Sequence, residues 1–141
     1  MKNFPSHEPR FTFNKEERLS RKKLIDELFK NGSSFYFHPF RIYYLKKSFE
    51  SLWPAQVLIT VSPRNFRHAV DRNRIKRLTR EAYRLNKHRL LESLSKNNQQ
   101  MLIGFVYSDK KIESFELIQK KMISILGRLA ELNVSPEKNS K

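Results

Sequence analysis

The sequence contains no cysteine, and it has only 14 acidic residues against 29 lysines and arginines. Without cysteine, disulfide bonds and thiolate-bound zinc sites are excluded. Apolar runs such as Met101 to Tyr107 fall far short of the roughly 20 residues that a membrane-spanning helix requires. The N-terminal residues also lack the apolar segment of a secretory signal. We therefore expect a cytoplasmic protein that does not enter a membrane.

Sequence patterns of catalytic and metal centres are also missing. The three glycines are isolated, so there is no glycine-rich phosphate loop. The histidines show no spacing typical of a metal site; they are His7, His38, His68 and His88. Acidic residues form no compact set of the kind that a two-metal nuclease needs, although carboxylates distant in sequence could still meet in space. We predict no catalytic residue, and no metal or cofactor bound by the protein alone.

The residues that are present describe one folded, basic domain. A chain of 141 residues fits a single domain, and 11 Phe, 5 Tyr and 1 Trp provide large side chains for its core. The formal charge of +15 calls for a polyanionic partner. We predict a flexible N-terminal arm over residues 1–17, a single polyanion-binding domain over residues 18–132, and a disordered tail over residues 133–141.

Hydrophobic periodicity predicts the elements of this domain. Ser20 would cap a first helix, and Gly32 would end it in a left-handed conformation. Alternating aromatic and β-branched residues predict one bent or two short strands over residues 33–47, then strands over 55–62 and 101–108. Two further helices are predicted over about 69–92 and 114–132. The resulting fold class is α+β, with a single four-stranded sheet and the order α-β-β-β-α-β-α.

The predicted helix after residue 69 concentrates the positive charge. Residues 64–89 include ten basic and two acidic residues, a net charge of +8. At about 100° per residue, one narrow stripe is apolar and faces the core; it consists of Ile75, Leu78, Ala82 and Leu85. The opposite face is polar and mostly cationic; it consists of Asn73, Lys76, Arg77, Arg80, Arg84 and Lys87.

Such a face can be an ordinary solvated surface or a site for a polyanion. A solvated helix usually places acidic residues three or four positions from basic ones, whereas here like charges take those positions and repel each other by a few tenths of a kcal/mol per pair. A phosphate backbone would offset this repulsion. Five basic side chains binding phosphates would give a salt slope of roughly −4. We therefore favour polyanion binding.

The segment AVDRNRIKRLTREAYRL resembles the signature of the bacterial ribonuclease P protein component, whose fold is shared with a ribosomal-protein domain. RLSRKKLIDELFKNGSSF and FRIYYL resemble the first helix and first long strand of that family, so the resemblance covers about residues 18–131. It implies a protein that binds a catalytic RNA and precursor tRNA, and that promotes endonucleolytic removal of the 5′ leader. It further implies magnesium at the RNA of the holoenzyme, no chemistry by the protein alone, and no required protein oligomer.

The resemblance also implies two sets of site residues. The set that would bind the catalytic RNA comprises Arg72, Asn73, Arg74, Lys76, Arg77 and Arg80. To it we add Arg84 and Lys87, because they continue the cationic face of the helix, and Arg64 and Arg67, because they carry charge in the loop before it. The set that would bind the leader comprises Ile25, Phe29, Phe40, Arg41 and Tyr43. Aromatic rings can stack on unpaired bases with about 1–3 kcal/mol each, but aromatic residues at strand spacing are also common in cores.

Two other functions stay open at this stage. A structural RNA-binding protein of ribosomal type would use the same basic helix without belonging to an enzyme. An autonomous nuclease would need carboxylates that meet only in the folded chain. Cleavage of precursor tRNA with and without ribonuclease P RNA separates all three possibilities.

Overall fold

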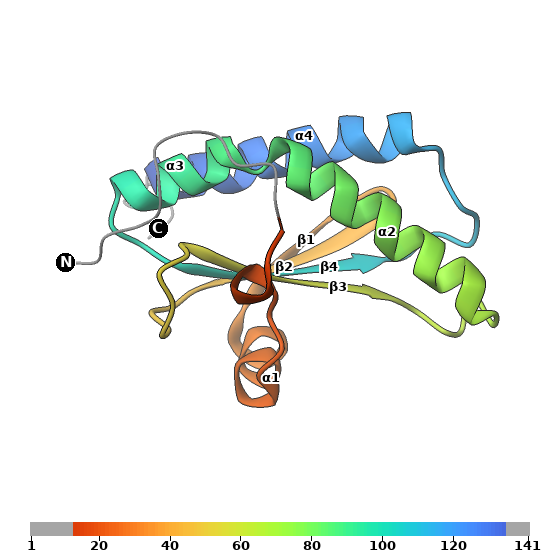
Figure 1. Cartoon of the computed structure of the whole chain (residues 1–141), viewed down its shortest axis with the longest axis horizontal. Coiled ribbons are helices and arrows are strands. Elements are labelled where there is room, and N and C mark those ends of the chain that lie inside the picture. Colours follow the sequence, from red (N-terminus) through yellow and green to blue (C-terminus); the bar gives the residue numbers. More distant parts are fainter. Residues whose placement is uncertain (1–12, 135–141) are drawn as a thin grey trace.

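The computed structural model describes residues 13–134, which form a mixed sheet packed between helices (Figure 1). The elements in chain order are η1 (Lys15–Glu17), α1 (Lys22–Asn31), β1 (Ser33–Phe37), β2 (Phe40–Lys46), β3 (Ala55–Val61), α2 (Ala69–Asn86), α3 (His88–Lys96), β4 (Met101–Tyr107) and α4 (Phe115–Val134). None of the helices in this described part is long and apolar enough to cross a membrane.

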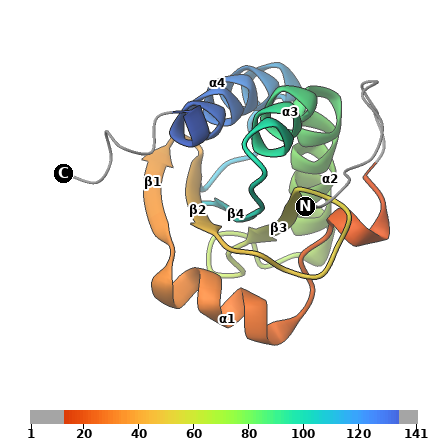
Figure 2. The same cartoon turned by 90° about the vertical axis from the view of Figure 1, so that its left-hand side faces the viewer.

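The four strands form one sheet in the order β1-β2-β4-β3. β1 pairs with β2 and β2 with β4 in antiparallel orientation, whereas β3 and β4 are parallel and are joined through α2 and α3. Helices α2, α3 and α4 cover one face of the sheet, and α1 lies on the other (Figure 2). The predicted α+β fold with a single four-stranded sheet is confirmed.

The strand β2 shows how the sheet separates core from surface. Phe40 and Ile42 are completely buried, whereas Arg41 is exposed and Tyr43 is partly exposed. Successive side chains of a strand point to opposite faces, so the buried pair lies in the main core beneath α2–α4. That core also contains Phe105 from β4. Arg41 and Tyr43 therefore lie on the face that carries α1.

The single helix predicted over about residues 69–92 is wrong, because the structure contains two helices that meet at Lys87. α2 ends at Asn86, and α3 begins at His88 in a different direction (Figure 1). The Lys87 ammonium lies in the interior, 2.5 Å from the Glu17 carboxylate and above the ring of Trp53. A helical wheel drawn through residue 87 therefore misplaces that side chain.

Both predicted ends of the first helix also differ from the structure. The residue before the helix is Arg21 rather than Ser20, and no side chain caps it. Gly32 has φ −76°, an extended conformation rather than a left-handed one. Its lack of a side chain serves close approach instead: a Cβ there would lie 2.8 Å from the carbonyl oxygen of Tyr44 and even nearer that of Leu28.

The domain begins earlier than the predicted boundary at residue 18. The Phe13 ring packs edge-on against Tyr83 at 5.5 Å, and Glu17 is 1% exposed. The Leu19 amide then donates a hydrogen bond to the carbonyl of Val57 on β3. At the other end α4 continues through Val134. The remaining residues of the predicted arm and tail, 1–12 and 135–141, lie outside the described residues.

Candidate nucleic-acid interface

Helix α2 packs on the sheet through a stripe that differs slightly from the predicted one. Ile75, Thr79, Ala82 and Tyr83 are buried, while Leu78 is only partly buried. The Thr79 hydroxyl donates to the carbonyl of Ile75 at 2.8 Å, which satisfies a polar group in an apolar stripe. The opposite side of α2 is thereby directed to solvent.

The solvent side of α2 carries a row of cations with few acidic neighbours. Asn73, Arg74 and Arg77 are exposed, and Lys76 and Arg80 are partly exposed. None of these four cations forms an ion pair with another described residue. We call them the α2 cations. The structure thus brings together most of the predicted cationic face, and leaves its charge without a protein counter-charge among residues 13–134.

Arg84 differs from the α2 cations because it has an acidic partner. Its Nη2 atom lies 2.5 Å from Oε2 of Glu81, one turn earlier on the helix. The hydrogen bond from Arg84 lowers the pKa of Glu81, and Glu81 in turn raises the pKa of Arg84. Part of the Arg84 charge is therefore neutralised before any ligand arrives.

The loop before α2 adds two more cations. Phe66 is buried and anchors the loop on the core, so that Arg64 and Arg67 remain exposed. Arg72 reaches back from α2 and donates to the carbonyl oxygens of Phe66 and Arg67 at 2.7 and 2.8 Å. Arg72 therefore stabilises the loop conformation in addition to carrying charge, which the sequence did not indicate.

The predicted position of Lys87 on the RNA-facing side of the helix is wrong. Its side chain is 1% exposed and forms an ion pair with Glu17. Because RNA phosphates cannot reach a buried ammonium without unfolding this region, Lys87 does not belong to the exposed basic surface.

On the other face of the sheet, α1 lies beside the aromatic residues of β2. Phe29 and Tyr43 form an edge-to-face pair with ring centroids 4.7 Å apart, and both rings, like Ile25, retain some exposure. Gly104 is the cross-strand neighbour of Tyr43, and a Cβ there would lie 3.5 Å from the Phe29 ring. This glycine lets α1 approach the sheet closely.

Phe40, predicted for the same surface, is on the opposite face. It is completely buried and packs edge-on against Phe105 and Tyr107, at 5.9 and 5.5 Å. The physical reason is that Phe40 and Tyr43 are three residues apart on one strand, an odd separation that directs their side chains to opposite faces. Phe40 is a core residue.

Arg41 lies where predicted, on the same face as Tyr43, and is exposed. Its guanidinium stacks over the ring of Tyr36 on β1 at 5.5 Å. Strand pairing places two residues of β3 on the same face, across β4 from Arg41 and Tyr43. They are Thr60 and Leu58, and both are partly exposed. Sequence reasoning missed Tyr36, Leu58 and Thr60, because strand pairing rather than local spacing places them there. We call Ile25, Phe29, Tyr36, Arg41, Tyr43, Leu58 and Thr60 the α1-side surface.

Comparison with known proteins identifies the family. The family model described as Ribonuclease P matches residues 13–130. The ribonuclease P protein component of Porphyromonas gingivalis W83 is 36% identical over 122 residues, covering 86% of this chain and 89% of that protein. That of Chlorobium phaeobacteroides is 36% identical over 130 residues, covering 84% and 89%.

Solved structures agree on the fold. The ribonuclease P protein of Staphylococcus aureus superposes with a TM-score of 0.63 at 22% identity, covering 79% of this chain and 94% of that one. The ribonuclease P protein of Thermotoga maritima gives a TM-score of 0.62 at 24% identity, covering 79% and 96%. The family match, the relatives and the shared fold together show that this chain belongs to the family of bacterial ribonuclease P protein components.

Proposed function

We propose that this chain, as the protein subunit of ribonuclease P in tRNA 5′ maturation, binds the catalytic RNA through the α2 cations together with Arg64 and Arg67. The observation that carries the proposal is that these six cations are at least partly exposed and have no acidic partner among the described residues. Six phosphate contacts correspond to a salt slope of roughly −5. Asn73, exposed among them, adds an amide that can both donate and accept hydrogen bonds.

The 5′ leader of precursor tRNA is proposed to bind the α1-side surface. Phe29, Tyr36 and Tyr43 offer rings on which unpaired bases can stack, and Arg41 offers a charge for the backbone. Stacking tolerates many base sequences, as an enzyme acting on many tRNA precursors needs. Because α1 and α2 lie on opposite faces of the sheet (Figure 2), the protein could hold both RNAs at once.

The chemistry of cleavage is assigned to the RNA subunit. In this proposal the protein positions the leader, magnesium ions are held by the RNA, and the holoenzyme works in the cytoplasm. The ribosomal alternative raised by the sequence is disfavoured by membership of the ribonuclease P family. The nuclease alternative predicts cleavage by the protein alone.

The proposal is tested by incubating end-labelled precursor tRNA with the purified full chain, with and without bacterial ribonuclease P RNA, at low magnesium. At a magnesium concentration where the RNA alone is nearly inactive, we expect mature 5′ ends only in the mixture of protein and RNA. Cleavage at the same position by the protein alone would contradict the assignment of chemistry to the RNA. An absence of stimulation by the protein would contradict the subunit role.

A further inference from the structure

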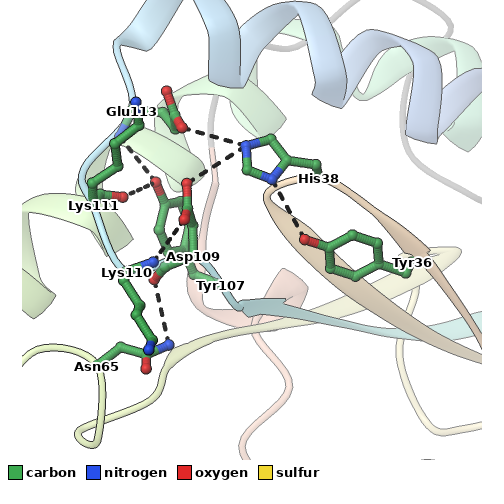
Figure 3. A network of polar contacts seen from close by, with 8 residues as sticks. All are labelled: Tyr36, His38, Asn65, Tyr107, Asp109, Lys110, Lys111 and Glu113. Carbon is green, nitrogen blue, oxygen red and sulfur yellow. Dashed lines mark hydrogen bonds and ion pairs between the residues drawn. The ribbon is translucent and has the colours of Figure 1, made fainter.

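Three potential metal ligands from two segments distant in sequence meet at one end of the sheet (Figure 3). His38 is in the turn between β1 and β2, whereas Asp109 and Glu113 are in the segment between β4 and α4. One imidazole nitrogen and two carboxylate oxygens lie within 4.8 Å of one another. No metal site was predicted here, because His38 and Asp109 are 71 positions apart in the sequence and form no local ligand pattern.

The two contacts of His38 in this cluster, of which the one to Glu113 is within hydrogen-bond range, are long and match the spacing of ligands of a common ion. Nε2 of His38 lies 3.3 Å from Oε2 of Glu113 and 3.5 Å from Oδ2 of Asp109. Two ligand atoms at about 2.1 Å from a tetrahedral zinc ion are about 3.4 Å apart. Hydrogen bonds between such groups are usually about 2.7–2.9 Å long.

The Oδ2 atom of Asp109, which faces His38 in this cluster, supports the same interpretation. It is buried and has no hydrogen-bond partner, although a buried carboxylate oxygen normally has one. The other oxygen, Oδ1, accepts a hydrogen bond from the Lys110 amide at 2.7 Å, which fixes the carboxylate with Oδ2 toward His38. The Lys110 side chain extends away from the cluster, toward Asn65 (Figure 3).

The histidine ring is also oriented for ligation. Its Nδ1 atom lies 3.4 Å from the hydroxyl of Tyr36, while Nε2 points to the two carboxylates (Figure 3). A metal-bound histidine commonly donates its other ring N–H to a nearby oxygen, which selects the tautomer with a free ligating nitrogen. Tyr36 is placed to accept that hydrogen bond. The Glu113 amide in turn donates to the hydroxyl of Tyr107 at 2.9 Å, which holds the backbone of this ligand.

We propose that His38, Asp109 and Glu113 form a binding site for one divalent transition-metal ion of the zinc type. One imidazole and two carboxylates are a ligand set suited to zinc and similar first-row ions, whereas magnesium prefers oxygen ligands in octahedral geometry. The His38 side chain is 46% exposed, so water can complete the coordination. The three ligands lie outside the two proposed RNA surfaces, although Tyr36 of the α1-side surface contacts His38. Zinc binding is measured without RNA, so the test does not depend on the RNA-binding proposal.

Such an ion would join the β1–β2 turn to the segment that precedes α4. That segment also contacts the basic loop, because the Asn65 amide group donates to the carbonyl of Asp109 at 3.4 Å. A bound ion would therefore brace the end of the sheet next to Arg64 and Arg67. We expect the ion to have a structural role, since this position brings no substrate group to the metal.

The test uses the untagged full chain, stripped of metal with a chelator. Zinc is titrated in competition with a chromophoric indicator, cobalt is added as a spectroscopic probe, and magnesium serves as the comparison ion. We expect one zinc per chain, visible-region cobalt bands, and no competition by equimolar magnesium. His38→Ala and Glu113→Gln should each weaken zinc binding about 100-fold, and Tyr36→Phe about tenfold.

Matched controls are His88→Ala and Glu116→Gln, which change exposed residues of the same types on α3 and α4. These variants should bind zinc like the parent. Thermal unfolding of the metal-free proteins checks that each variant is folded, and zinc should raise the melting temperature only where the three ligands are intact. The proposal fails if the parent binds no zinc, or if folded His38→Ala and Glu113→Gln bind it as tightly as the parent.

Discussion

The Nζ atom of Lys87 and the Oε1 atom of Glu17 lie 2.5 Å apart, and each of the two side chains is 1% exposed. Lys87→Met should destabilise the domain by about 3–5 kcal/mol, because it leaves a buried carboxylate without its cation. Urea unfolding of the full chain measures this loss.

The double variant Glu17→Gln with Lys87→Met should recover much of the lost stability, since it removes both charges. The pair would then be a structural link between the N-terminal segment and the α2–α3 junction. If Lys87→Met were instead as stable as the parent but bound the catalytic RNA with a smaller salt slope, the ammonium would be an RNA contact.

Removing one of the α2 cations should weaken binding of the catalytic RNA. Arg77→Ala is expected to reduce the magnitude of the salt slope by about 1, because one fewer phosphate contact releases fewer counterions. Arg84→Ala should have a smaller effect, since Glu81 already neutralises part of its charge. Filter binding across a range of potassium concentrations measures both slopes.

Lys96→Ala is the control for this comparison, because it removes an exposed cation at the far end of α3. It should leave the slope unchanged. Equal losses for Arg77→Ala and Lys96→Ala would mean that overall charge, rather than the face of α2, determines affinity.

Substitutions on β2 should separate leader binding from stability. Tyr43→Ala removes a partly exposed ring and should weaken the affinity of the holoenzyme for precursor tRNA by about 1–3 kcal/mol, with little effect on mature tRNA. Phe40→Ala removes a fully buried ring and should cost about 3–5 kcal/mol of folding stability. Equal losses of precursor and mature tRNA binding in Tyr43→Ala would exclude the leader assignment.

Tyr83 carries a buried hydroxyl that has no hydrogen-bond partner among the described residues. Tyr83→Phe should therefore stabilise the domain by about 1 kcal/mol at neutral pH, since the ring contacts with Phe13 and Phe105 remain. Chemical denaturation at pH 7 measures the change. A loss of stability would show that the hydroxyl has a partner in solution.

The same substitution should alter the response to alkaline pH. Burial, reinforced by the nearby Glu17 charge, raises the pKa of Tyr83 far above its ordinary value of about 10. The folded state therefore holds this proton more tightly than the unfolded state. The contribution of this protonation to the free energy of unfolding is complete below pH 10 and is lost as the pH rises above 10. Tyr83→Phe should lose less stability than the parent above pH 10.

Local patterns predicted most of the fold. The strands β3 and β4 and the last helix were found within one or two residues. β4 is a continuous apolar run that is buried along most of its length, whereas the buried residues of the last helix recur at the helical period. The break at Lys87 could not be predicted in this way. The side chain of Lys87 at this break binds a carboxylate 70 residues earlier, a contact that no local pattern can indicate.

The candidate site was predicted unevenly for related reasons. The solvent-facing cations of α2 follow from the helical period, so Lys76, Arg77 and Arg80 were placed correctly on the solvent side. The role of Arg72 depends on loop carbonyls that only the folded chain brings within reach. Phe40 is different, since the strand period alone places it opposite Tyr43, and the prediction erred by following the resemblance instead.

The alternation along β2 has a consequence for how the protein tolerates change. Neighbouring positions of this strand are under different constraints. Phe40 and Ile42 are packed in the core, whereas Arg41 and Tyr43 belong to the proposed leader surface. A saturation library of β2, selected separately for folded protein and for tRNA maturation, should give two profiles that are out of phase by one residue. The strand would thus let substrate preference drift between bacteria while the scaffold stays unchanged.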